Sequence, residues 1–173
     1  MEYNRLWILV EGNDDEKLVT KIKPVFEEKY KSVTIWKYAQ QLHKKTCGFL
    51  RSISSMQSSD YFFLQDINQS PCITAKKEKV KDEYGEIINL TKVVIVIKEI
   101  ESWYLAGLND VACRELRIKI LNNTNAITKE DFNRIKPQKY DSRIDFMQEI
   151  LKRFSIETAK EKNTSFDYFM SKI

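Results

Sequence analysis

Acidic side chains follow three of the most apolar segments of the chain, at the point where each segment ends. Glu11 comes directly after Trp-Ile-Leu-Val, Asp66 follows Tyr-Phe-Phe-Leu-Gln, and Glu99 and Glu101 come just after Val-Val-Ile-Val-Ile. Asp15 lies four residues after Glu11, which is about one turn if a helix begins there. Clustered carboxylates repel one another unless a cation lies between them. These residues therefore favour a divalent metal site, and oxygen ligands suit Mg²⁺ or Mn²⁺.

The composition gives little support to other catalytic chemistry. The 173-residue chain has one histidine, His43, so a metal site with two histidines is excluded. His43 lies in a Gln-Leu-His-Lys-Lys stretch that is typical of the solvated face of a helix. The three cysteines form no Cys-x-x-Cys pair, which argues against disulfides and a zinc site and favours a reducing cytoplasm. Carboxylates and lysines must therefore carry the chemistry of any enzyme.

The acids can meet only if the strands before them end at the same edge of a sheet. The sequence has the pattern of such a parallel sheet. Short apolar runs alternate with helical spacing through the first hundred residues, as buried parallel strands and covering helices do. The expected strands are Arg5–Val10, Val33–Tyr38, Tyr61–Gln65 and Val93–Ile97. The sequence therefore predicts an α/β fold, with a Rossmann-like, mainly parallel four-stranded sheet flanked by helices. Ligands bind at the carboxyl ends of parallel strands, so we expect the acids to meet there.

Helical spacing accounts for the remaining elements. A helix is expected from Asp14, kinked or shortened at Pro24, and two others over residues 40–56 and 74–84. After residue 108 the strand pattern stops, and further helices are expected over residues 111–121, 129–135, 142–154 and 165–173. The predicted α/β domain therefore spans 1–108, followed by a helical part over 109–173 that packs on it.

A purely structural explanation of the acids is also open. Acidic residues often follow strands because they favour turns or cap the next helix. For any single acid that explanation is the better one. Acids after three strongly apolar strands in one chain favour a shared site instead.

Two segments carry a resemblance to a known family. Residues 9–15, Leu-Val-Glu-Gly-x-x-Asp, precede an amphipathic helix, and residues 63–68, Phe-Leu-Gln-Asp-Ile-Asn, end a later strand. Together they resemble the Toprim domain of topoisomerases, primases, RNA-maturation nucleases and OLD-type nucleases. Residues 97–106 and, more loosely, the C-terminal part are similar to small stand-alone Toprim-like bacterial proteins related to the OLD-type nucleases.

The resemblance implies roles for individual residues. Glu11 matches the family glutamate, and Asp66 matches the first aspartate of an Asp-x-Asp motif; in the family these residues bind Mg²⁺ and perform phosphoryl transfer. Asp15 matches the acid that OLD-type members use for a second metal. Asn68 stands where the second aspartate is expected, so it offers an oxygen ligand but no negative charge. A second ion would then depend on Asp15 with Glu99 or Glu101.

A nuclease also needs a general base and a cation that neutralises charge on the phosphate. The general base would be a metal-activated water or Glu11. Charge that develops on the phosphate needs a further cation, for which Lys98 and Lys136 are the candidates. For both lysines, a solvated surface position is the better explanation.

These features predict a divalent-metal-dependent nuclease that hydrolyses or nicks DNA or RNA. The resemblance alone implies a role in bacterial defence or repair, and it allows an ATPase or another protein as a partner. A catalytically weak or inactive nucleic-acid-binding accessory protein is the alternative, because Asn68 replaces an aspartate. A hydrolase of small phosphorylated ligands is the third possibility.

Charge and hydropathy bear on the partner. Between Lys17 and Arg51 the chain has nine Lys and Arg but only two acids, Glu27 and Glu28. Such a basic segment favours contact with a phosphate backbone, although a solvated helix face explains it equally well. The longest apolar runs are far shorter than the roughly 20 residues that cross a bilayer, and the first residues are not typical of a signal peptide. We therefore expect no membrane association.

Overall fold

The computed structural model describes residues 4–173, so Met1–Tyr3, where the sequence argues against a signal peptide, lie outside the described residues. The chain divides into two compact units. The first unit runs to Ile95 and also includes Ile173, and the second unit is Val96–Lys172. This division comes earlier in the chain than the boundary after residue 108 that the sequence suggests.

The first unit contains the sheet, and its α/β class is the one that the sequence predicts. The strands are β1 (Arg5–Val10), β2 (Ser32–Lys37), β3 (Ser59–Asp66) and β4 (Val93–Val96), in the order β2-β1-β3-β4. β1 pairs in parallel with both β2 and β3, so that Leu9 lies opposite Trp36 on one side and Phe63 on the other. The carboxyl ends of these central strands therefore lie at the same edge, which places Glu11 and Asp66 there.

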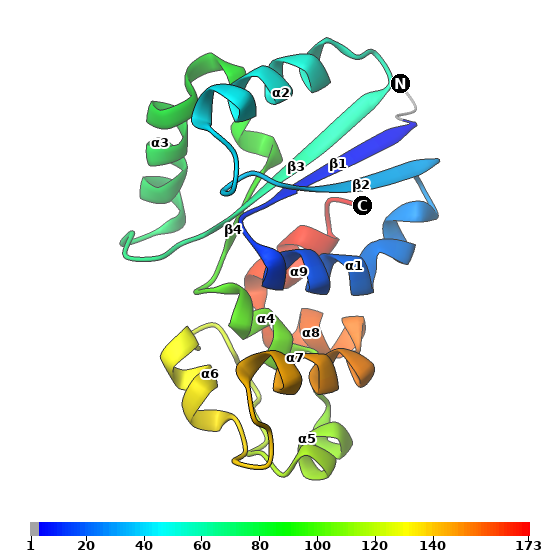
Figure 1. Ribbon diagram of the computed structural model, residues 1–173, viewed down its shortest axis with the longest axis vertical. Helices are drawn as coiled ribbons and strands as arrows, with labels where there is room; N and C mark the ends of the chain where they lie inside the picture. Colours follow the sequence, from blue (N-terminus) through cyan, green and yellow to red (C-terminus); the bar gives the residue numbers. More distant parts are fainter. Residues whose placement is uncertain (1–3) are drawn as a thin grey trace. The chain divides into compact units, whose positions relative to one another are not determined.

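Helices cover both faces of this sheet (Figure 1). α1 (Asn13–Glu27) lies on one face, and α2 (His43–Ser55) and α3 (Ile73–Tyr84) lie on the other, where they share a core with Leu9 and Phe63. α1 continues past Pro24 to Glu27, so the expected shortening at that residue does not occur. The apolar face of α1 is fully buried on both sides of the proline, and this packing outweighs the backbone hydrogen bond that proline cannot donate.

Two short 3₁₀ helices, η1 (Gly85–Ile87) and η2 (Leu90–Lys92), lead from α3 into β4. Gly85 has a positive φ of 61°, a conformation that favours glycine, and it ends α3. The backbone amide of Asn89 donates to the Tyr61 hydroxyl at 2.8 Å. This bond ties the connection to β3.

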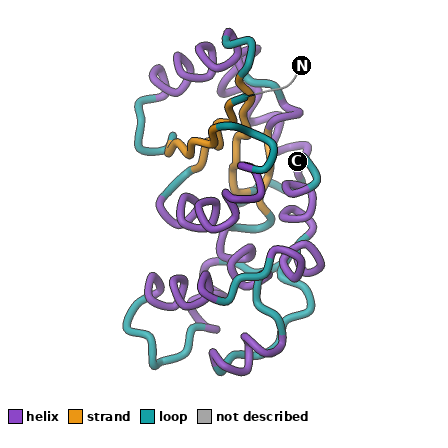
Figure 2. The backbone as a smooth tube through the Cα atoms, turned by 90° about the vertical axis from the view of Figure 1, so that its right-hand side faces the viewer, coloured by secondary structure: helices purple, strands orange, loops and turns teal. Residues whose placement is uncertain are grey.

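The second unit contains helices and loops beyond the end of β4 (Figure 2). The helices are α4 (Ile100–Ala106), α5 (Asp110–Leu116), α6 (Lys129–Ile135), α7 (Arg143–Lys152), α8 (Ile156–Lys162) and α9 (Thr164–Met170). α5 is shorter than the sequence predicts, because Arg117 adopts a left-handed conformation with φ 62°. α8 is not predicted at all, since its only fully buried side chain is Ala159. No helix of the described residues is both long and apolar enough to span a membrane.

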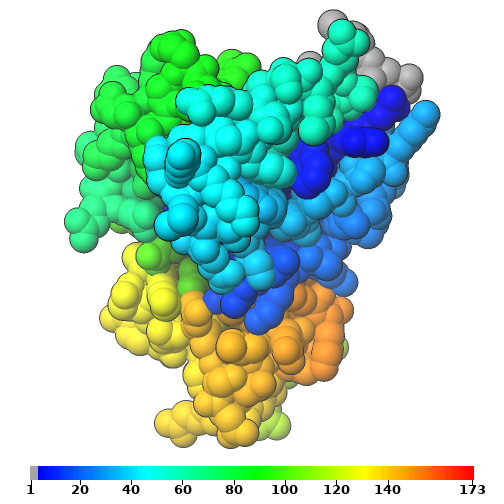
Figure 3. All heavy atoms as spheres, turned by 45° about the horizontal axis from the view of Figure 1, so that its top comes forward, coloured from blue at the N-terminus to red at the C-terminus, as the bar shows by residue number. Residues whose placement is uncertain are grey.

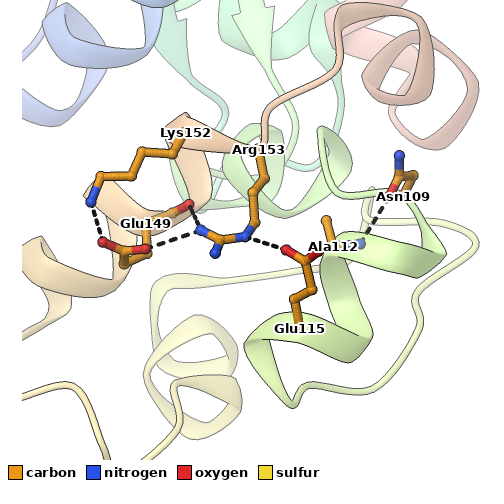
Figure 4. A network of polar contacts seen from close by, with 6 residues as sticks. All are labelled: Asn109, Ala112, Glu115, Glu149, Lys152 and Arg153. Atoms are coloured by element: carbon orange, nitrogen blue, oxygen red, sulfur yellow. Dashed lines mark hydrogen bonds and ion pairs between the residues drawn. The ribbon is translucent and has the colours of Figure 1, made fainter.

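A surface network joins α5 to the end of α7 (Figure 4). The Arg153 guanidinium donates to Glu115 at 2.8 Å and to Glu149 at 3.0 Å, and Lys152 forms an ion pair with the same Glu149. Asn109 caps α5 by accepting the backbone amide of Ala112 at 2.9 Å. Exposed pairs of this kind contribute little to stability individually, because water and salt screen them.

A buried polar network joins α4 to α9. Asn163, which is 1% exposed, donates to the Ile97 carbonyl at 3.1 Å and to the Ser102 hydroxyl at 3.2 Å. The Ser165 hydroxyl accepts the indole N–H of Trp103 at 2.8 Å and the backbone amide of Ile97 at 3.0 Å. The segment 97–103, in which sequence reasoning places metal ligands, is therefore fixed by hydrogen bonds with Asn163 and Ser165 of its own unit.

Candidate functional site

Glu11 lies directly after β1, in the turn that leads into α1. Burial raises the pKa of its carboxyl above the ordinary glutamate value. The Lys76 charge, and hydrogen bonds with the side chains of Tyr38 and Gln65, partly offset that rise. Glu11 is therefore a half-buried acid held by a cation and by side-chain donors, as a functional carboxylate is.

Asp15 and Asp66 lie at the same edge of the sheet as Glu11. Asp15 is 7% exposed, and its Oδ2 accepts the backbone amide of Gly12 at 3.1 Å, which caps α1. Asp66 is the last residue of β3. Burial and the charges of Glu11, Asp15 and Asp66 together raise the pKa of the Tyr38 phenol. The tertiary structure thus gathers three of the acids that the sequence singles out around one buried tyrosine.

Tyr38, Gln65 and Lys76 complete this edge, and sequence reasoning misses all three. The Tyr38 hydroxyl donates to the Leu64 carbonyl at 3.0 Å and also reaches Glu11. Gln65 was expected only as a strand residue, and Lys76 only as one of the lysines of a helix. The one available signal was that Gln65 directly precedes Asp66. Tyr38 and Lys76 belong to other elements, and only folding brings them to Glu11.

Asn68 has a local structural explanation. It lies exposed in the turn after β3 with a positive φ of 51°, a conformation in which asparagine and aspartate are both enriched. The backbone of this turn therefore accounts for the residue, whether or not its amide oxygen contacts a ligand.

The oxygen donors at this edge fit Mg²⁺ bound by few protein ligands. In the described part of the chain, no three His, Cys, Asp or Glu side chains are placed to hold a metal together. Mg²⁺ commonly uses one or two carboxylates, and water and substrate phosphate complete its coordination. Gln65 Oε1 is buried without a hydrogen-bond partner among residues 4–173, while the same side chain hydrogen-bonds with Glu11. Glu11, Asp66 and this amide oxygen are the donors that an ion would find.

The other predicted residues belong to the second unit, where two of the acids have structural partners. Glu99 precedes α4, and its Oε2 accepts the backbone amide of Lys129 at 2.5 Å, at the first residue of α6. Glu101 is 4% exposed and forms an ion pair with Arg143. Burial raises the pKa of Glu101, and the Arg143 charge opposes that rise. Both acids therefore contact residues of the helical unit itself.

The two predicted lysines also lie in the second unit. Lys98 is exposed. Lys136 ends α6, and its ammonium donates to the Tyr140 carbonyl at 2.7 Å. The contact of Lys136 closes the turn between α6 and the following loop.

His43 is exposed, as its sequence context suggests, and it also has partners. Its Nε2 lies 3.2 Å from the Cys47 sulfur, its Nδ1 lies 3.6 Å from a Glu83 carboxylate oxygen, and its ring packs on Tyr84. Cys47 is 8% exposed, so its thiol is covered by the core. We assign this group to the packing between α2 and α3.

The basic segment, Lys17–Arg51, is partly neutralised by acids within it and next to it. Lys23 pairs with Glu27 at 3.0 Å, and Lys37 pairs with Glu16 at 2.7 Å. Arg51, on α2, lines an open hollow with Glu86 of η1. Figure 3 shows the cyan surface of α2 next to the green surface of the α3 segment. The basic segment is thus a mixed surface rather than one continuous positive face.

Comparisons with known proteins add no relative. No family model matches the chain, and no curated protein and no solved structure shows significant similarity to it. The fold and the geometry at the carboxyl edge of the sheet are therefore the guides to function.

The raised pKa of Glu11 predicts a pH-dependent gain in stability for Glu11→Gln. A carboxyl whose pKa is higher in the folded than in the unfolded state binds protons more readily when folded, so stability falls as the pH rises through that interval. Glutamine removes this penalty. We expect Glu11→Gln to melt above the native protein at about pH 7 and together with it at about pH 4.

Thermal melts in EDTA across this pH range measure the effect. Glu28→Gln, at the exposed C-terminal end of α1, is the matched control and should follow the native curve. A Glu11→Gln variant that melts below the native protein at neutral pH would show that the ionised carboxylate stabilises the fold.

Proposed function

We propose that this protein is a divalent-metal-dependent nuclease that hydrolyses or nicks DNA or RNA. The observation that carries the proposal is that Glu11, Asp15 and Asp66 lie at the same carboxyl edge of a parallel sheet. Acids that lie near one another in a half-buried place repel, and a bound cation or a catalytic role is a common reason for such a group. The resemblance of residues 9–15 and 63–68 to the Toprim domain supports the same assignment.

The roles follow from the contacts of each residue. Glu11 and Asp66, with the Gln65 amide oxygen, would hold Mg²⁺ or Mn²⁺, which when bound supplies Lewis acidity toward a phosphate oxygen. Asp15 keeps α1 capped and adds negative charge beside the ion. Tyr38, bonded to the Leu64 carbonyl, orients Glu11. The edge of an open sheet leaves room for a polymer, which favours a nucleic acid over a small phosphorylated ligand.

Nicking of supercoiled plasmid and cleavage of labelled RNA, each with Mg²⁺ or Mn²⁺, test the proposal. We expect Glu11→Gln and Asp66→Asn to lower the rate at least about 100-fold, since each removes a group needed in the transition state. Glu28→Gln, which removes an acid from the opposite end of α1, should retain the native rate. Cleavage that survives both substitutions at the site, or native protein that cleaves neither substrate, would contradict the proposal.

The second candidate is a nucleic-acid-binding accessory protein without catalysis. Asn68 and the lack of a three-acid metal group among the described residues favour it. Such a protein would bind an oligonucleotide equally well with and without Mg²⁺ and would leave it intact. The cleavage assay and a binding titration on the same preparation separate the two functions.

A further inference from the structure

Lys76 is a buried lysine that lacks a partner. It lies in the first turns of α3 and is 8% exposed, yet its ammonium group forms no hydrogen bond or ion pair within residues 4–173. The covered part is the apolar stem, while the ammonium group reaches the surface, so packing holds an unpaired cation in a fixed place.

The other lysines of α3 behave differently. Lys77 donates to the Leu90 carbonyl at 3.0 Å, and Lys79 donates to the Ser70 hydroxyl at 3.2 Å. Lys81 pairs with Glu86 at 3.3 Å and is half-exposed. Lys76 alone among these four lysines is both buried and without a bond.

The charge of Lys76 is directed at the candidate site. α3 begins a few residues after Asp66, the last residue of β3, so Lys76 in its first turns lies near the carboxyl edge of the sheet, and its charge opposes the rise in the pKa of Glu11. Lys76 and Glu11 form no ion pair within 4.0 Å. The ammonium group is therefore available to an anionic oxygen bound near the carboxylates.

We infer that the Lys76 ammonium group binds a non-bridging phosphate oxygen of the nucleic acid beside Glu11. Lysine binds phosphate as a compact point charge, and a covered stem holds that charge in place. This inference rests on the proposed function and deepens it. Lys76 would then have the role that the sequence suggests for Lys98 or Lys136, which is to neutralise charge on the phosphate. Its positive charge would also reduce the need for a second metal ion.

Binding in EDTA tests the inference without metal or catalysis. The probe is a fluorescein-labelled single-stranded oligonucleotide, and its anisotropy is titrated over a series of salt concentrations. We expect Lys76→Met to weaken binding about tenfold and to lower the slope of log Kd against log salt by about 0.7, the value for one phosphate contact on a single strand. Lys76→Arg should retain most of the affinity.

Lys81→Met is the matched control, since it removes the same charge from the exposed end of the same helix. It should change the affinity less than about threefold, as a distant surface charge does. Lys76→Met should also melt close to the native temperature, because methionine covers the same surface as the apolar stem of lysine.

Three results would overturn the inference. They are native affinity in Lys76→Met, an equal loss in Lys81→Met, and a Lys76→Met protein that melts well below the native one. The last result would make Lys76 a structural partner of Glu11. If the native protein binds through Lys76 but cleaves neither DNA nor RNA, the proposed nuclease fails while the phosphate contact stands.

Discussion

Replacing Asn163 with leucine is expected to lower the free energy of unfolding by about 4 kcal/mol. The side chain is 1% exposed, and its amide group donates to the Ile97 carbonyl, the Ser102 hydroxyl and the Thr124 hydroxyl. Leucine has a similar volume but supplies no donor. Each of these oxygens would then remain buried with fewer partners, which costs about 1–3 kcal/mol per unpaired group.

The amide oxygen of Asn163 adds to the expected loss. It accepts the backbone amides of Ser165 at 3.1 Å and Phe166 at 3.0 Å, and it therefore caps α9. Loss of an N-cap costs about 1 kcal/mol. The estimate for the whole substitution stays below the sum of these contributions, because a network relaxes when one member is removed.

Urea unfolding followed by far-UV circular dichroism measures this effect. Asn122→Leu is the control, because Asn122 is exposed and forms no hydrogen bond with the described residues. It should change stability by less than about 0.5 kcal/mol. If Asn163→Leu unfolds at the native urea concentration, the buried network contributes no net stability and the explanation of segment 97–103 is wrong.

Gly107→Ala is the second substitution with a large expected effect. An alanine Cβ at this position would lie 2.2 Å from the ring of Phe154, and other ring atoms would lie within 2.7 Å. The backbone of Gly107 has φ −72° and ψ −2°, which any residue can adopt, so the cost comes from the contact alone. Such overpacking costs about 1–3 kcal/mol, and we expect about 3 kcal/mol because three ring atoms of Phe154 would lie closer to the Cβ than van der Waals contact allows.

A matched pair isolates the contact. Gly48 lies inside α2, and a Cβ there would meet no atom within 4 Å, so Gly48→Ala should stabilise the protein by about 0.5–1 kcal/mol. Adding Phe154→Leu to Gly107→Ala should recover part of the loss, because the smaller side chain frees the space. The explanation fails if Gly107→Ala is as stable as the native protein. It also fails if Phe154→Leu lowers the stability of Gly107→Ala by as much as it lowers the stability of the native protein.

The fold class was predictable because its signals are local. Four apolar runs separated by helical spacing lead to a four-stranded parallel sheet, and β1 has the predicted bounds. The errors arise where a tertiary contact or one backbone angle decides the outcome. Packing carries α1 through Pro24, Arg117 ends α5 with a positive φ, and α8 forms although it buries little apolar surface.

The candidate site was predictable in part. Glu11 and Asp66 follow directly from strand ends, since parallel strands must end at one edge. Asp15 was predicted at the same edge, and it also caps α1, so the structural and the functional explanations of this acid both apply. Glu99 and Glu101 carry the same local signal, but the structure gives them partners inside the helical unit.

The sequence by itself determines which acids follow strands, because the spacing of apolar residues that distinguishes a strand from a helix is visible in neighbouring residues. It does not determine which residues from other elements face those acids. Tyr38 lies at the end of the neighbouring strand and Lys76 lies on a helix beyond β3, and both reach Glu11 only because the apolar faces of the sheet and helices pack together. That packing decides which side chains are buried and which cation lies near Glu11. Only the tertiary structure therefore determines both.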